Sequence, residues 1–207
     1  MNLLCFGDSN TYGYMPGGIG RFDSETRYCG LLSHLLGEAW SISENGVVGR
    51  TACFTEKKRP GKNGLDDIHL AVKKANPDLI LLMLGTNDVK SEFNANENIL
   101  ADNITYLAKK ALESAKELGK SPRILLISPA SISEDVFKYT DNYNAKSIRV
   151  SRKLSETYNK TAKDNNFLFL DANDYANVSP SDGEHLDKTG HHSLALAISD
   201  LIKSTSF

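Results

Sequence analysis

The chain opens with M-N-L-L-C-F-G-D-S-N-T-Y-G-Y, residues 1–14, and this stretch decides the fold. Residues 3–6 form an apolar run without polar alternation, which is typical of a strand buried on both faces of a parallel sheet. The Gly, Asp, Ser and Asn that follow are turn residues. The pattern predicts that Ser9 lies just past the carboxyl end of a first strand, where open α/β sheets bind ligands. An ordinary turn or cap residue would suit this position equally well.

Length and composition bound the class of protein. With 207 residues, the chain is expected to form one domain over residues 1–207 with a sizeable core. The net charge of −2 gives no basic footprint for nucleic acid, and no apolar run approaches the roughly 18 residues that span a bilayer. The amino terminus lacks the charged and apolar regions of a signal peptide. We therefore expect a cytoplasmic protein with neither nucleic-acid nor membrane partners.

Apolar runs and helical patterns alternate along the rest of the chain. Further strands are predicted at residues 40–43, 78–84, 123–127 and 167–170. Helices are predicted at residues 25–36, 65–75, 96–118, 146–165 and 188–202. Strands that alternate with helices form parallel βαβ units with right-handed crossovers. We therefore expect an α/β fold, a three-layer α/β/α sandwich with a central parallel sheet of about five strands. The unbroken apolar run at 78–84 should be its central strand.

Four loops that follow predicted strands carry residues suited to one reaction. Ser9 follows the first strand, Gly49 the second, Asn87 the third, and Asp182 and His185 the fifth. A serine needs an adjacent base to become a nucleophile, and a histidine with a pKa of ~6.5 suits that task. The aspartate three residues earlier can orient the histidine. Two backbone N–H groups, at Ser9 and Gly49, and the Asn87 amide could converge on a developing oxyanion.

These blocks carry a family resemblance. In order along the chain they read G-D-S-N-T-Y-G, N-G-V-V-G-R-T, G-T-N-D and D-G-E-H-L-D-K-T-G-H. They resemble the four blocks of the SGNH (GDSL-type) hydrolase superfamily. The segments G-R-T, P-G-K-N-G-L and L-L-M-L-G-T-N-D-V-K-S-E-F resemble its arylesterase or acyltransferase branch. The resemblance spans Gly7 to His191, which is nearly the whole chain.

The resemblance implies a flavodoxin-like fold and a serine esterase that needs no cofactor and no metal. Ser9 would be the nucleophile, His185 the base and Asp182 its orienting partner. Ser9, Gly49 and Asn87 would form the oxyanion hole. The enzyme would hydrolyse, or transfer, short acyl groups of small esters through an acyl-enzyme. We expect activity to rise between about pH 6 and 8 as His185 loses its proton.

One residue departs from the family pattern, and the substrate stays open. Asn10 replaces the usual leucine after the serine, and we expect it to tune the turn. The irregular segment 130–145 and the loop 51–64 should shape the acyl pocket. The branch favours short acyl chains, with carbohydrate acetylesterase, lysophospholipase and thioesterase as alternatives. A homo-oligomer through the loop 51–64 is expected only by analogy.

The sequence leaves two other classes of function open: a metal-dependent enzyme and a non-catalytic binding module. Carboxylates and histidines crowd the end of the chain: Asp182, Glu184, His185, Asp187, His191 and His192. Such a cluster can bind a metal, as in a metal-dependent phosphoesterase, although the early D-x-H pair of those enzymes is missing. A non-catalytic carbohydrate- or nucleotide-binding module would leave the set of serine, aspartate and histidine unexplained. Chelation should abolish the activity of a metalloenzyme and spare a serine esterase.

Several residues near these blocks have structural explanations. Asp8 is expected to be a turn residue, and Asp88 to cap or orient its loop. Arg50 could hold a polar group of the substrate or form a surface salt bridge. Cys5 and Cys29 lack the spacing of a zinc site or a disulfide framework, so we expect buried, small apolar residues.

Overall fold

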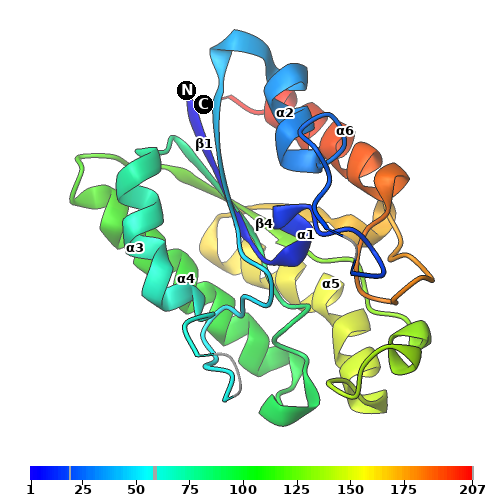
Figure 1. The fold of residues 1–207 in the computed structure, drawn as a ribbon. Coiled ribbons are helices and arrows are strands. Elements are labelled where there is room, and N and C mark those ends of the chain that lie inside the picture. The colour runs from blue at the N-terminus through cyan, green and yellow to red at the C-terminus, as the bar shows by residue number, and fades with distance from the viewer. Residues whose placement is uncertain (19, 58–59, 207) are drawn as a thin grey trace.

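A computed structural model describes residues 1–18, 20–57 and 60–206 of the chain. It contains a sheet of five parallel strands in the order β2-β1-β3-β4-β5 (Figure 1). The strands are β1 (Asn2–Gly7), β2 (Ser41–Gly46), β3 (Leu79–Met83), β4 (Arg123–Ser128) and β5 (Leu168–Asp171). The prediction that the third apolar run forms the central strand is confirmed.

Helices join the strands. The α-helices are α1 (Ser9–Tyr12), α2 (Tyr28–Leu36), α3 (Gly64–Ala75), α4 (Glu97–Lys116), α5 (Ala145–Asn165) and α6 (Lys188–Ser204). Short 3₁₀ turns are η1 (Gly37–Ala39), η2 (Ser91–Phe93), η3 (Glu134–Lys138) and η4 (Ala172–Asp174). None of the helices in the described part of the chain is both long and apolar enough to cross a membrane.

Helices cover both faces of the sheet. Helices α3, α4 and α5 pack on one face, and α2 and α6 pack together on the other (Figure 1). Successive residues of one strand face opposite layers: Leu4 and Phe6 join the core under α3, whereas Leu3 and Cys5 join the core under α2. A strand buried on both faces must be apolar at every position, which explains the run without alternation. The predicted three-layer α/β/α sandwich is confirmed.

The register of the sheet brings the functional loops to one rim. Gly7 at the end of β1 pairs with Gly46 of β2 and with Met83 of β3. The carboxyl ends of these three strands are therefore level. On the other side of β3, Ser128 of β4 pairs with Asp171 of β5. All loops that leave these ends meet at the same edge of the sheet, as the parallel arrangement requires.

Two boundaries differ from the sequence prediction by three residues, and the others agree within two. Strand β2 runs on to Gly46, because Asn45 and Gly46 pair with the last two residues of β1. Helix α2 begins at Tyr28, three residues later than expected. The residues before it form a turn, in which the N–H groups of Thr26 and Arg27 donate to the Asp23 carbonyl. The described residues between β2 and α3 are 47–57 and 60–63. Lys58 and Arg59 lie outside the described residues.

Candidate active site

Ser9 is held at the point where the first strand turns into α1. It is the first residue of this four-residue helix, and Asp8 caps the helix by accepting a hydrogen bond from the Asn10 N–H at 2.9 Å. The turn needs Gly7, because a Cβ there would lie 1.9 Å from Thr11 Oγ1 and 2.7 Å from the Met83 carbonyl oxygen. Strand, glycine and cap together fix the Ser9 hydroxyl at the rim of the sheet.

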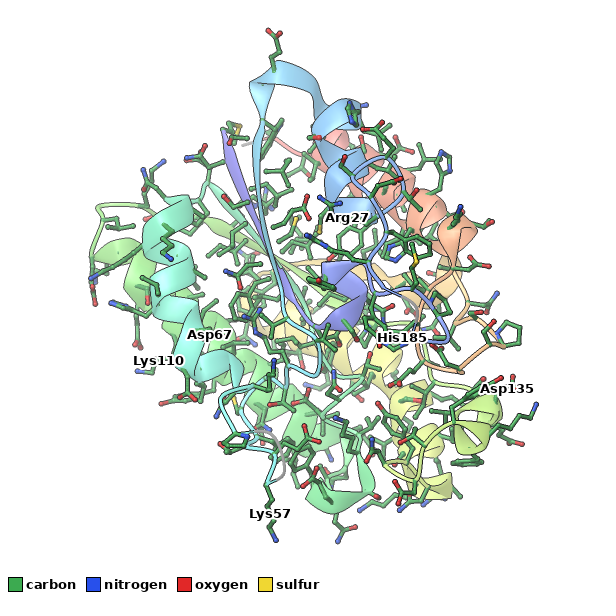
Figure 2. All side chains as sticks on the ribbon, viewed as in Figure 1. Arg27, Lys57, Asp67, Lys110, Asp135 and His185 are labelled. Carbon is green, nitrogen blue, oxygen red and sulfur yellow. The ribbon has the colours of Figure 1, made fainter. Side chains whose placement is uncertain are left out.

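The structure brings the three residues expected to form a triad into one chain of hydrogen bonds. His185 Nε2 lies 3.0 Å from Ser9 Oγ, and His185 Nδ1 lies 2.8 Å from Asp182 Oδ2. A carboxylate only accepts, so Nδ1 carries the proton and Nε2 is left to accept from the serine. All three side chains are buried. Figure 2 shows His185 beside α1, on the loop that leads into α6.

The Asp182 carboxylate is firmly anchored. Its Oδ1 accepts hydrogen bonds from the N–H groups of Glu184 and His185, and its Oδ2 accepts from the Gly17 N–H at 2.9 Å. Burial alone would raise the pKa of Asp182, but these bonds and the one from the imidazole outweigh it and hold the pKa below its ordinary value. Asp182 is therefore a fixed negative charge behind the histidine.

The charges around His185 set its basicity. Burial lowers the pKa of His185, because it penalises the imidazolium. The hydrogen bond to Asp182 and the negative charges of Glu184 and Asp8 outweigh burial, so the pKa of His185 lies above its ordinary value. A carboxylate beside a histidine thus favours its protonated form.

Gly49 and Asn87, the two other residues expected at the site, line the same cavity as Ser9. Gly49 has a φ of +83°, in the left-handed region that favours glycine. The Asn87 Nδ2 is buried and has no hydrogen-bond partner among the described residues. A buried donor without a partner is costly. Its position in the cavity wall makes it available to an oxygen of a bound molecule.

Arg50, which follows Gly49, forms a salt bridge from a buried position. Its side chain is 1% exposed, and its guanidinium donates to the partly exposed carboxylate of Asp67 at 2.8 Å. Its other bonds go to the carbonyl oxygens of Gly7 and Asn45 at 3.0 and 2.5 Å. Arg50 ties together the ends of β1 and β2 and is absent from the cavity lining. The expected salt bridge therefore forms, although Arg50 itself is buried, and the expected contact with a substrate is not supported by the cavity lining.

The cavity at the rim is small and polar. Its volume is about 160 Å³, below the roughly 300–1,000 Å³ typical of sites for drug-sized ligands. Ser9, Gly49, Asn87 and His185 form one part of the lining. The rest comes from Tyr14, Val48, Lys90, Asn142, Tyr143 and Glu184. Asn142 and Tyr143 belong to segment 130–145, which is expected to shape the pocket. The sequence analysis assigns no such role to Tyr14, Val48, Lys90 or Glu184, although the last three stand within the quoted blocks.

The two segments expected to shape the pocket contribute differently. Segment 130–145 supplies Asn142 and Tyr143, and the Tyr143 hydroxyl donates to Glu184 Oε2 at 2.6 Å. The described part of the loop 51–64 supplies no lining residue. This loop instead contacts a lining residue: the Glu56 carboxylate lies 3.4 Å from Lys90 Nζ, and both side chains are at most 5% exposed.

Two buried aspartates lie behind the site, next to the nucleophile and to the asparagine. Burial raises the pKa of Asp8 to about 6 and that of Asp88 to about 7. The negative charge of Asp8 raises the pKa of Asp88 further. Asp88 Oδ1 accepts a hydrogen bond from the Ala52 N–H at 2.9 Å, which ties the loop after β2 to the loop after β3. The expected structural roles of both aspartates are confirmed.

The carboxylates and histidines near the end of the chain, a candidate metal site from the sequence, are dispersed in the structure. His191 is fully buried, where its Nδ1 accepts from the Tyr28 N–H at 3.4 Å, and burial lowers its pKa to about 4. Asp187 caps α6 by accepting from the Gly190 N–H. Among residues 1–18, 20–57 and 60–206, no three His, Cys, Asp or Glu side chains are grouped so that they could hold a metal ion.

Comparison with known proteins agrees with this geometry. A model of the GDSL-like lipase/acylhydrolase family matches residues 5–193. The chain belongs to this family. As a GDSL-like hydrolase, with esterases among its structural neighbours, it is a carboxylic ester hydrolase. A search of curated protein sequences gave no match.

Solved structures of similar proteins share the whole fold of this GDSL-like hydrolase. The aryl esterase of M. smegmatis is 27% identical, with a TM-score of 0.92 and 98% of each chain covered. Est24, a carbohydrate acetylesterase from Sinorhizobium meliloti, is 28% identical, also with a TM-score of 0.92 and 98% of each chain covered. A putative arylesterase from Agrobacterium tumefaciens is 26% identical, with a TM-score of 0.86 over 98% of this chain and 99% of that one.

The raised pKa of Asp88 predicts a pH-dependent gain of stability for Asp88→Asn. Unfolded, the carboxyl ionises near pH 4, whereas folded it ionises near 7. As the pH rises through this window, wild-type stability is lost, and it does not return above pH 7. A neutral amide avoids this loss. The gain in free energy of unfolding should grow from pH 4 to 8, up to roughly 4 kcal/mol.

Denaturant titrations at several pH values measure this effect. Asp102→Asn on the exposed side of α4 controls for the loss of a negative surface charge. A gain that is the same at every pH would contradict the prediction.

Proposed function

We propose that this hydrolase cleaves short acyl esters of small, polar alcohols, with Ser9, His185 and Asp182 as the catalytic triad. One observation carries the proposal: an unbroken hydrogen-bond chain from Asp182 through His185 to the Ser9 hydroxyl, at 2.8 and 3.0 Å. A serine paired with an oriented base is an activated nucleophile. It stands at the edge of the cavity, where an ester carbonyl can reach it.

In the first half of the reaction, Ser9 Oγ attacks the ester carbonyl while His185 Nε2 takes the hydroxyl proton. The negative charge that develops on the carbonyl oxygen is stabilised by the N–H groups of Ser9 and Gly49 and by Asn87 Nδ2. Each such donor is worth about 3 kcal/mol of barrier. The tetrahedral intermediate then collapses, the bond to the alcohol breaks, and His185 gives its proton to the departing alkoxide. The acyl group remains on Ser9.

In the second half, a water molecule or another alcohol attacks the acyl-enzyme. His185 takes the proton of the attacking group and returns it to Ser9 Oγ as the acyl group leaves. Asp182 keeps its charge throughout and stabilises the imidazolium formed in each half. With water the product is a free carboxylic acid; with an alcohol it is a new ester.

Size and polarity of the cavity support the substrate class. A volume of about 160 Å³ suits a short acyl group. Lys90, Asn142, Tyr143 and Glu184 offer donors and acceptors to a hydroxylated alcohol. The similarity to a carbohydrate acetylesterase supports the same choice. The long chains of a lysophospholipid or of a fatty thioester suit this cavity less well.

Labelling with a fluorophosphonate tests the nucleophile. This reagent reacts with activated serines, so wild type should gain one adduct, mapped to Ser9 by peptide mass spectrometry. Ser9→Ala should gain none and lose esterase activity by at least about 10³-fold. Excess chelator should change neither result. Absence of an adduct on folded wild type, or labelling of Ser9→Ala at the same rate, would refute the proposed triad.

A substrate series tests the proposed substrate class. Because the cavity is small, kcat/KM for nitrophenyl esters should fall by at least about tenfold between acetyl and octanoyl chains. Acetylated sugars should be deacetylated, which acetate release measures. A maximum at eight or more carbons, with acetylated sugars untouched, would favour the lipid alternatives.

The electrostatics of His185 predict how Glu184 affects the pH profile. The base acts only when neutral, so kcat/KM should be half-maximal at the pKa of His185, above 6.5. Glu184→Gln removes a nearby negative charge and lowers that pKa. The acidic limb should therefore move to lower pH by a few tenths to about one unit.

Tyr143→Phe is the matched control for Glu184→Gln. It removes the hydrogen bond at Glu184 but keeps the carboxylate charge, so its acidic limb should not move to lower pH. Equal shifts in both variants would show that the geometry of the loop, rather than the charge of Glu184, determines the pH at which the acidic limb lies.

A further inference from the structure

Asn10 connects the helix that carries the nucleophile to the loop that carries His185. Its side chain is buried, and its Nδ2 donates a hydrogen bond to the Glu184 carbonyl oxygen at 3.1 Å. Its Oδ1 accepts a hydrogen bond from the Leu186 N–H at 2.9 Å. These two backbone groups stand immediately before and after His185. One side chain therefore holds the backbone on both sides of the proposed base.

Few side chains could make this contact. It needs a donor and an acceptor in one plane, which the amide of asparagine provides at this length. Aspartate offers only acceptors when ionised, and leucine offers neither a donor nor an acceptor. Asn10 is also fixed at its own end, because its N–H donates to Asp8 Oδ1 at 2.9 Å and it lies within α1. The connection is therefore stiff at both ends.

The other restraints on His185 leave a role for this connection. The bonds between Asp182 and His185 join residues three apart, so they orient the ring within its own loop. They do not hold that loop against the nucleophile. Asn10 does so directly, because it is the residue after Ser9. The two segments are thus joined twice: by the contact of 3.0 Å between Ser9 Oγ and His185 Nε2, and by the hydrogen bonds of the Asn10 side chain.

We propose that Asn10 is a positioning residue, which sets the separation and alignment of Ser9 Oγ and His185 Nε2. This inference rests on the proposed triad. Proton transfer from serine to histidine is steep in distance and angle, and a misplacement of about 1 Å can cost 10²-fold in rate. Without the amide, the Glu184 carbonyl and the Leu186 N–H lose their partner, and the loop relaxes away from α1. Asn10 itself is not among the residues that line the cavity, so its loss removes no direct contact with the substrate.

Two substitutions at Asn10 test the proposal. Asn10→Leu removes both hydrogen bonds. Asn10→Asp keeps the size and the acceptor for the Leu186 N–H, but it sets an oxygen against the Glu184 carbonyl. Both variants should lose at least tenfold in kcat, with KM for a nitrophenyl acetate changed less than threefold. The rate of fluorophosphonate labelling at Ser9 should fall in parallel.

Thr11→Val is the matched control, since it removes a buried hydrogen bond between the same helix and Tyr28, and neither residue is among those that line the cavity. That bond joins Thr11 Oγ1 to the Tyr28 hydroxyl at 2.8 Å. The control should lower the melting temperature but leave kcat within about twofold of wild type. If Asn10→Leu does not fold, the near-isosteric Asn10→Asp carries the test.

The outcomes separate this inference from the proposed function. If wild type is labelled at Ser9 and a folded Asn10 variant is labelled at the same rate with unchanged kcat, Asn10 is only structural and the inference is overturned. A fall of kcat in Thr11→Val equal to that in the Asn10 variants overturns it as well. If wild type itself is not labelled, the triad fails, and the role of Asn10 fails with it.

Discussion

The site depends on the close approach of α1 to the ends of two neighbouring strands. Gly7 and Gly46 pair with each other at the end of β1 and β2. A Cβ on Gly7 would meet Thr11 Oγ1 at 1.9 Å, and one on Gly46 would meet the Tyr12 N at 2.1 Å. Contacts this short leave no room for any side chain. Because both positions are glycine, the helix rests directly on the strands, and Ser9 is placed there by backbone packing.

Connections between loops convert this placement into a fixed geometry. Arg50 binds the ends of the first two strands, and Asp88 binds the loop after β2 to the loop after β3. The Ser133 N–H donates to the Gly183 carbonyl, which attaches segment 130–145 to the loop that carries His185. Loops are the mobile part of most folds. Here each loop at the rim is held by a hydrogen bond to another, so the groups at the cavity are organised before a ligand arrives.

The sequence predicts the layers and the site residues because both are encoded locally. Unbroken apolar runs indicate doubly buried strands, and the blocks with Ser9 and Asn87 each follow such a strand directly. The connections between blocks are different in kind. From the sequence, Arg50 could contact a substrate or form a surface salt bridge, because a charged residue is usually exposed. Its partners at Gly7, Asn45 and Asp67 come from three separate segments. Likewise, nothing near Asn10 in the sequence indicates that its side-chain amide forms hydrogen bonds with residues more than 170 positions away. Such pairings exist only once the sheet is assembled.

Three buried aspartates near the histidine show how the fold assigns charge. Asp182 accepts hydrogen bonds at both oxygens, so its pKa lies below the ordinary value despite burial. Asp8 and Asp88 each have an Oδ2 without a partner among the described residues, and their pKa values rise to about 6 and about 7. Asp182 is less deeply buried than Asp8 and Asp88 and accepts more hydrogen bonds, and both differences favour its ionised form. The fold thus keeps a full negative charge where it orients the imidazole, whereas Asp88, with a pKa of about 7, is only about half ionised at neutral pH. Less negative charge beside Asn87 favours the oxyanion that the proposed reaction must form.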